Sequence, residues 1–224
     1  MRSDTTIARA GEAEGPLEFT AGTWGFFGWS LLVMLGEVLI IPSPWTSAAY
    51  YRWCVAHARV PGARQPVFIG TAGDIWWAFV LLGLLGYAGA YSGWLELALA
   101  VFEVLLYWVV IRWFFAKLSW QDQTAPLAFT GSYWGLLGWS VLCWLSIFTI
   151  IGWAWAIPAM TRWICRNVQG GQRPLAFTAT GLGLLWRSIV LVLCSILIIP
   201  IPWISRWYAA WLVSQFYLGT PPRA

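Results

Sequence analysis

Long apolar runs separated by short polar connectors fill the chain from about residue 23 to its end. Each run has the length of one helix, and Pro or Gly turns divide the runs into pairs. A helix of about 17–20 residues spans about 25–30 Å, close to the thickness of a hydrocarbon core. The predicted pairs are 23–41 and 44–60, 74–91 and 94–117, 133–151 and 153–168, and 182–199 and 202–218. The expected fold is an all-α membrane protein, a polytopic bundle of four tandem helical hairpins.

One starting motif recurs four times, which indicates an internal repeat. PLEFTAGTWGFFGWS begins at Pro16, PLAFTGSYWGLLGWS at Pro126 and PLAFTATGLGLLW at Pro174, with a weaker copy, PVFIGTAGDIWW, at Pro66. Pro16 and Pro126 are 110 residues apart and Pro66 and Pro174 are 108 apart, which indicates a tandem duplication of an ancestral pair. Proline before apolar residues favours a short extended segment ahead of each first helix. The candidate caps of those helices are Thr20, Thr23, Asp74, Ser132 and Thr180.

The repeat divides the chain into two pairs of hairpins between polar ends. The expected parts are a flexible tail at 1–15, a first pair at 16–118 (hairpins 16–65 and 66–118), a connector at 119–125, a second pair at 126–219 (hairpins 126–173 and 174–219) and a tail at 220–224. The first tail has no apolar core of the kind that a signal peptide requires.

Each hairpin turn carries Pro or Gly followed by Trp, which suits a reversal at a membrane surface. The turn pairs are Pro44-Trp45, Gly93-Trp94, Gly152-Trp153 and Pro202-Trp203. Each Trp follows its own starting proline by 29, 28, 27 and 29 residues. Composition alone would not hold that spacing, so we interpret these residues as interfacial turns.

Lys and Arg lie in the connectors and are absent from the turns, which predicts cytoplasmic connectors and termini with the turns outside. A rival topology lays three of the second helices along the membrane surface, since they carry arginines such as Arg52 and Arg59 on one face. That arrangement would put the first and third basic connectors on opposite sides of the membrane, against the rule that basic connectors stay on the cytoplasmic side. We therefore favour hairpins that cross the membrane.

Composition supports lipid as the solvent. The chain is 60% hydrophobic and 10% charged and holds 20 Trp, whereas soluble proteins are typically about 25% charged. Its net charge of +4 comes from basic residues scattered singly, so no nucleic-acid-binding face is predicted. The four cysteines show no metal-ligand or redox spacing, and we expect neither a metal nor another cofactor.

Two segments, 17–76 and 127–186, resemble the YjgN-type bacterial inner-membrane proteins, a domain family of unknown function. The residues that carry the resemblance are Phe19, Pro44, Trp45, Arg52, Trp53, Gly62 and Arg64, and in the second copy Phe129, Arg162, Trp163, Asn167, Gly171 and Arg173. His57 departs from the pattern where the family has Asn, and Trp153-Ala154-Trp155 replaces Pro-Trp. The resemblance implies a multi-pass protein of the bacterial inner (plasma) membrane and implies no reaction.

Acidic residues inside apolar segments are the first candidates for function in a membrane protein. Glu103 lies deepest in its predicted helix, while Glu96 and Glu37 lie nearer the outer turns. Together they could line a polar cavity that takes a proton or a cation. The alternative is that Glu103 is protonated and hydrogen-bonded while the other two reach the interface.

Arginines recur on the second helices at Arg52, Arg162 and Arg206. They could pair with the carboxylates or hold lipid phosphates, because guanidinium binds phosphate in a bidentate manner. No catalytic triad, phosphate loop or metal motif is present, so we predict no enzymatic activity and assign no catalytic residue.

The expected function is the binding, or the movement, of lipid or a small amphipathic solute, since transporters are often built from repeats. The alternative is a structural or accessory subunit that packs against a larger membrane complex. The expected partners are membrane lipids, with a membrane protein or a second copy of the chain as further candidates.

Overall fold

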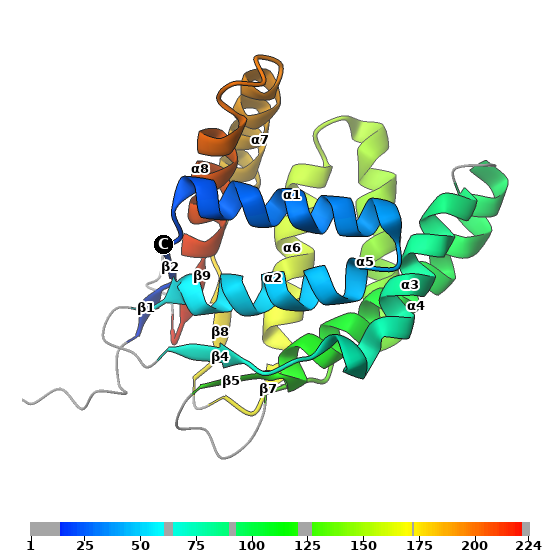
Figure 1. The fold of residues 1–224 in the computed structure, drawn as a ribbon, viewed down its shortest axis with the longest axis horizontal. Helices are drawn as coiled ribbons and strands as arrows, with labels where there is room; N and C mark the ends of the chain where they lie inside the picture. Colours follow the sequence, from blue (N-terminus) through cyan, green and yellow to red (C-terminus); the bar gives the residue numbers. More distant parts are fainter. Residues whose placement is uncertain (1–13, 61–64, 90–92, 121–126, 172, 221–224) are drawn as a thin grey trace, which may run out of the picture.

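The computed structural model describes residues 14–60, 65–89, 93–120, 127–171 and 173–220. The chain is mostly helical, which confirms the predicted helical class (Figure 1). The helices in the described residues are α1 (Thr23–Leu39), α2 (Ser43–His57), α3 (Ala72–Gly89), α4 (Gly93–Ala116), α5 (Tyr133–Ser146) with the 3-10 turn η1 (Ile147–Thr149), α6 (Trp153–Arg166), α7 (Gly181–Ser195) and α8 (Ile201–Ser214).

Short strands flank every pair of helices. They are β1 (Gly15–Pro16), β2 (Glu18–Phe19), β3 (Ala58–Arg59), β4 (Pro66–Phe68), β5 (Leu118–Trp120), β6 (Ala128–Phe129), β7 (Val168–Gln169), β8 (Leu175–Phe177) and β9 (Phe216–Leu218). The strand before each first helix pairs antiparallel with the strand after the second helix: β2 with β3, β4 with β5, β6 with β7 and β8 with β9. Each unit is therefore strand–helix–helix–strand, and a small ladder ties the open end of its hairpin.

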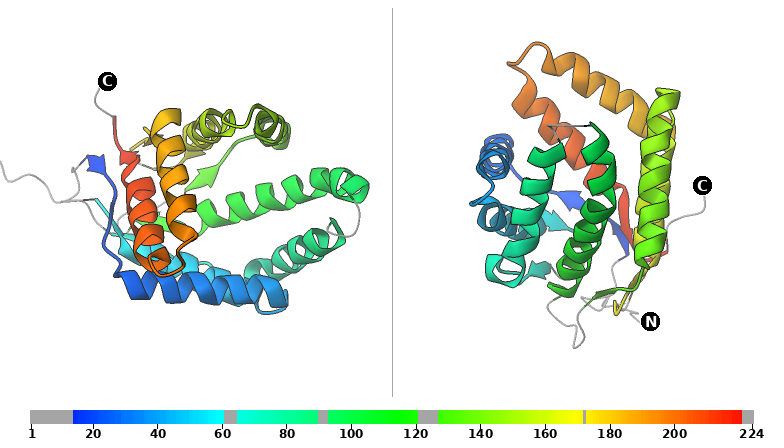
Figure 2. Two further views of the ribbon diagram at one scale, coloured as in Figure 1. Left: turned by 90° about the horizontal axis from the view of Figure 1, so that it is seen from above. Right: turned by 90° about the vertical axis from the view of Figure 1, so that its right-hand side faces the viewer.

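The four units form a closed ring. We number them in chain order, so that unit 1 contains α1 and α2 and unit 4 contains α7 and α8. The second helix of each unit packs against the first helix of the next, and α8 returns to α1. Strand β1 adds to the closure by pairing with β9 of unit 4. Figures 1 and 2 show the ladders gathered at one end of the molecule, with the hairpins diverging from that end.

The helices of units 1, 3 and 4 are shorter than the helices that the apolar runs predict. They have 14–17 residues, because the chain leaves the helix for a ladder at one end and for the turn at the other. Only α3 and α4, with 18 and 24 residues, are long and apolar enough to cross a membrane by length and composition, within the described part of the chain.

Helix starts follow the expected capping in part. Ser132 and Thr180 accept the N–H groups of Gly135 and Gly183, as predicted. Helix α1 instead begins after Gly22 without a side-chain cap, so neither threonine proposed there serves as one. The hydroxyl of Thr20 is engaged elsewhere, since it donates to the carbonyl of His57.

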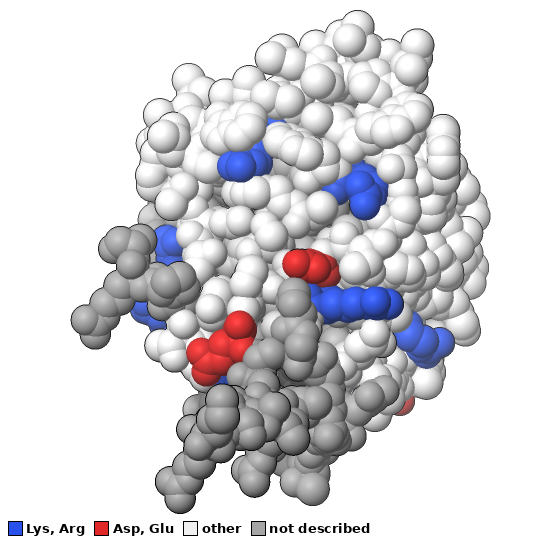
Figure 3. Space-filling model, turned by 90° about the vertical axis from the view of Figure 1, so that its left-hand side faces the viewer, with Lys and Arg blue, Asp and Glu red and all other residues white. Residues whose placement is uncertain are grey.

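The larger of two buried apolar clusters among the described residues lies where units 1 and 2 meet. Its buried members include Phe68, Ile75 and Trp113, with Tyr51 and Phe114 packed against them. A second, smaller cluster contains Phe177. Many other large apolar side chains are exposed along the hairpins, among them Leu39, Phe148 and Ile199. Charged side chains gather beside the ladders, on the face that Figure 3 shows. The described charged residues that lie in or close to the strands in the sequence are Glu14, Glu18, Arg59, Asp74, Lys117, Arg166 and Arg173.

Candidate functional site

Within each unit, a Trp near the end of the second helix packs on the start of the first. In units 1, 3 and 4 the ring faces a glycine, where an added Cβ would meet the Trp at 3.3, 2.5 and 3.7 Å. Those pairs are Gly25–Trp53, Gly135–Trp163 and Gly183–Trp211. In unit 2 the glycine is replaced by Asp74, which accepts a 3.4 Å hydrogen bond from Nε1 of Trp113 and forms a 3.2 Å salt bridge with Lys117.

Between units, one side chain of each second helix donates a hydrogen bond to a backbone carbonyl at the start of the next unit. We call these four interactions the ring bonds. They are Arg52 Nη2 to Gly70 O (2.9 Å), Trp108 Nε1 to Gly131 O (2.8 Å), Arg162 Nη1 to Ala179 O (2.9 Å) and Arg206 Nε to Ala21 O (2.6 Å). All four accepting residues are buried, so an unpaired carbonyl at any of them would be costly.

The positions of the ring bonds agree with the predicted duplication of a pair of units. Arg52 and Arg162 stand five residues before His57 and Asn167, whose carbonyls accept the first hydrogen bond of their ladders. Trp108 and Arg206 stand nine residues before Lys117 and Gln215, which play the same part in units 2 and 4. Units 1 and 3 therefore resemble each other, as do units 2 and 4. Comparing the units from their starting prolines does not reveal Trp108. It aligns with Arg206 only when residues are counted backwards from the last strand of each unit.

The ring bonds show what the three recurrent arginines contact. Each donates to a carbonyl of a neighbouring unit, and none forms an ion pair with Glu37 or Glu103 among the described residues. These guanidinium groups are therefore engaged in holding the ring.

The acidic candidates are only partly brought together. Glu37 is exposed near the end of α1 and Glu103 is half-buried in α4, and both lie within electrostatic range of Tyr107. Neither carboxylate has a hydrogen bond or an ion pair with another described residue, although the backbone carbonyl of Glu37 accepts the N–H of Ile40. Gly93 begins α4, and the side chains of Trp94 and Glu96 lie outside the described residues.

The turn residues differ in their surroundings. Pro44 and Pro202 are buried, and Trp203 stacks edge-on against Trp24 of unit 1 with ring centroids 5.4 Å apart. Trp45 is exposed, while Trp153 donates from Nε1 to the carbonyl of Ile150 at 2.8 Å.

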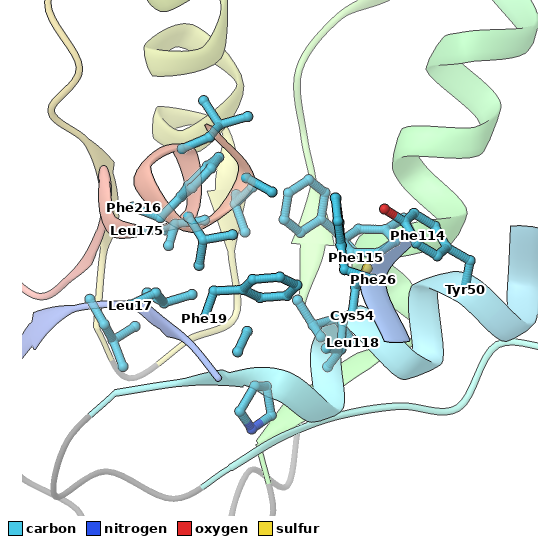
Figure 4. Close-up of a pocket in the computed structure, with 18 of the residues that line it drawn as sticks. Leu17, Phe19, Phe26, Tyr50, Cys54, Phe114, Phe115, Leu118, Leu175 and Phe216 are labelled. Carbon is cyan, nitrogen blue, oxygen red and sulfur yellow. The ribbon is translucent and has the colours of Figure 1, made fainter. Parts of the chain in front are cut away.

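A cavity of about 660 Å³ lies inside the ring and is lined by all four units (Figure 4). Its walls are mainly aromatic and aliphatic, with Phe19, Phe115 and Phe216 among the residues drawn. The polar lining consists of Ser30, Tyr50, Cys54, Ser205 and Tyr208, together with Arg173 at the ladder end. Such a space can hold an apolar chain and can offer a few hydrogen bonds to one end of it.

Comparisons with protein-family models, with curated proteins and with solved structures return no match for this chain. The YjgN-type resemblance therefore stays a prediction. Among the described residues, no group of three or more His, Cys, Asp or Glu side chains is placed to hold a metal ion.

Proposed function

We propose that the protein is an integral membrane protein whose ring of hairpins holds the apolar chain of a lipid or of a small amphipathic solute. The cavity carries this proposal, because all four units line it and most of the lining side chains are apolar. Its volume of about 660 Å³ falls within the roughly 300–1,000 Å³ typical of small-molecule sites.

The exterior of the protein supports a place in lipid. Only 17% of the apolar window in each of α3 and α4 is buried inside the protein, whereas a core helix of a soluble protein would be mostly buried. Exposed Leu, Ile, Val, Phe and Trp side chains also cover the outside of the other hairpins. So many exposed large apolar side chains indicate contact with a partner or with a membrane.

The polar lining suggests how an amphipathic ligand would be oriented. Arg173 stands at the ladder end, where the charged side chains gather, while Tyr208 and Ser205 lie along α8. A ligand with an anionic or polar head would place that head toward the ladders and its chain between the hairpins, because burying the head among phenylalanines would be costly.

The test is native mass spectrometry and organic extraction of the protein purified in mild detergent. We expect a bound apolar ligand in the unmodified protein. Ala209→Phe fills the cavity from α8 and should lose most of that ligand, whereas Ala56→Phe, on an exposed position of α2, should keep it. Equal ligand content in both variants would contradict the cavity site. An empty cavity together with a stoichiometric protein partner would favour the accessory-subunit alternative.

A further inference from the structure

The hairpin turns of units 1, 3 and 4 share one rare backbone conformation. Ile40, Ile150 and Ile198 have φ of 60°, 65° and 59°. In each turn the N–H of the following residue donates to the carbonyl of the preceding one, at 2.7, 2.7 and 2.6 Å. This is the γ-turn with positive φ, which is uncommon and strained, and a β-branched residue is the least suited to it.

A turn in water would use glycine, asparagine or aspartate at such a position. These turns instead place isoleucine there and surround it with further apolar residues. The exposed fractions of Ile41, Ile150 and Ile199 are 73%, 81% and 80%, and residues 38–47, 144–155 and 196–205 include no charged side chain. Three units thus share a strained, uncharged and largely apolar turn that water would disfavour.

The turns also cover their own polar backbone groups. Ser43 Oγ donates to the carbonyl of Ile40 at 2.7 Å. Thr149 Oγ1 donates to the carbonyl of Ser146 and accepts the N–H of Gly152 at 2.9 Å. The α2 and α8 starts hold prolines, which have no N–H to satisfy. Local satisfaction of this kind is what hydrocarbon demands, since it offers no water to an open backbone group.

The hairpins of these units are too short to cross a bilayer. Helices of 14–17 residues reach about 21–26 Å, less than the roughly 30 Å of a hydrocarbon core. The hairpins of units 1 and 4 are also inclined to each other (Figure 1), and Arg206, in the first half of α8, reaches Ala21 at the ladder end of unit 1. A tilted hairpin extends a shorter distance from the ladder end into the membrane than an upright one of the same length.

We propose that the turns of units 1, 3 and 4 enter the bilayer from the ladder side and end inside its hydrocarbon core. The charged ladder end then stays at one membrane surface. This inference rests on the proposed membrane function and replaces the crossing hairpins expected for these three units. Unit 2, whose helices are the longest, is the one that could reach the far side.

The test uses single cysteines in a variant whose four native cysteines are replaced by alanine, reconstituted into phosphatidylcholine–phosphatidylglycerol vesicles. Ile199→Cys and Ile150→Cys report on two turns, and Gln169→Cys, on exposed β7, is the control at the ladder end. Each cysteine is exposed to a membrane-impermeant maleimide from each side. It is then labelled with bimane in detergent and quenched by lipids that carry nitroxides at shallow or deep positions.

We expect the turn cysteines to react several-fold more slowly than Gln169→Cys from either side, and to be quenched most by the deep nitroxide. Ready modification of the turns from the side opposite to Gln169→Cys would overturn the inference and leave the membrane proposal intact. Absence of quenching at both turns, with free reaction in intact vesicles, would overturn both.

Discussion

The side chain of Arg206 donates a 2.6 Å hydrogen bond from Nε to the carbonyl oxygen of Ala21, which lies 185 positions earlier in the chain. The other three ring bonds join units that follow one another in sequence. This one joins the last unit to the first, so it closes a row of hairpins into a ring. The cavity depends on that closure because units 1 and 4 both line it.

Removal of this bond should weaken the whole fold. Arg206→Ala leaves the buried carbonyl of Ala21 unpaired, which should lower the free energy of unfolding by about 1.5–3 kcal/mol, as for other hydrogen bonds from charged groups. The measurement is the Tm of the purified protein in detergent. Arg166→Ala, on an exposed arginine of α6, is the matched control and should change Tm little. Equal Tm values for the two variants would contradict the role of Arg206 in closing the ring.

Two glycines on one helix should respond to alanine in opposite directions. An added Cβ at Gly135 would lie 2.5 Å from the Trp163 ring, so Gly135→Ala should destabilise the protein by about 1–3 kcal/mol. Gly138 has no neighbouring atom within 4 Å of such a Cβ, so Gly138→Ala should stabilise α5 by about 0.5–1 kcal/mol. Thermal unfolding in detergent compares both variants with the parent. An unchanged or raised Tm for Gly135→Ala would show that the Gly135–Trp163 contact does not hold the hairpin together.

The strained turns should be relieved by glycine where the isoleucine packs on nothing. Ile150→Gly should raise the unfolding free energy in detergent by about 1 kcal/mol, because glycine adopts positive φ without penalty. Ile40 has the same backbone but lies against Gly83 of α3, so Ile40→Gly also loses packing and should gain less or lose stability. Tm values of the two variants measured together decide this. A lower Tm for Ile150→Gly would contradict strain at its turn.

The sequence was enough to predict the helical class and the four starting motifs, because apolar runs and recurring prolines are visible in one chain. It also located the extended segment before each first helix. The returning strands, such as β3 and β7, could not be found, since two residues such as Val168–Gln169 carry no alternating pattern. The α-helix ends were also missed. The apolar run continues through Ile147 and Ile199, although the α-helix has already ended at Ser146 and Ser195.

The contacts of the arginines were beyond prediction for a different reason. Arg52, Arg162 and Arg206 bind backbone carbonyls, and a carbonyl has no sequence signature. From the sequence, the expected partners of an arginine are acidic side chains or lipid phosphates. Trp108 was missed because a different residue type makes the same bond in unit 2. The cavity likewise needs the closed ring, which no local pattern predicts.

Whether the protein is embedded in lipid can be measured by where the full chain partitions when it is produced in bacteria. The exposed apolar hairpins predict that it sediments with the membranes, stays there through washes with alkaline carbonate and urea, and is released only by detergent. Recovery of a folded, monodisperse protein in the soluble fraction without detergent would contradict the claim that its outer surface faces lipid.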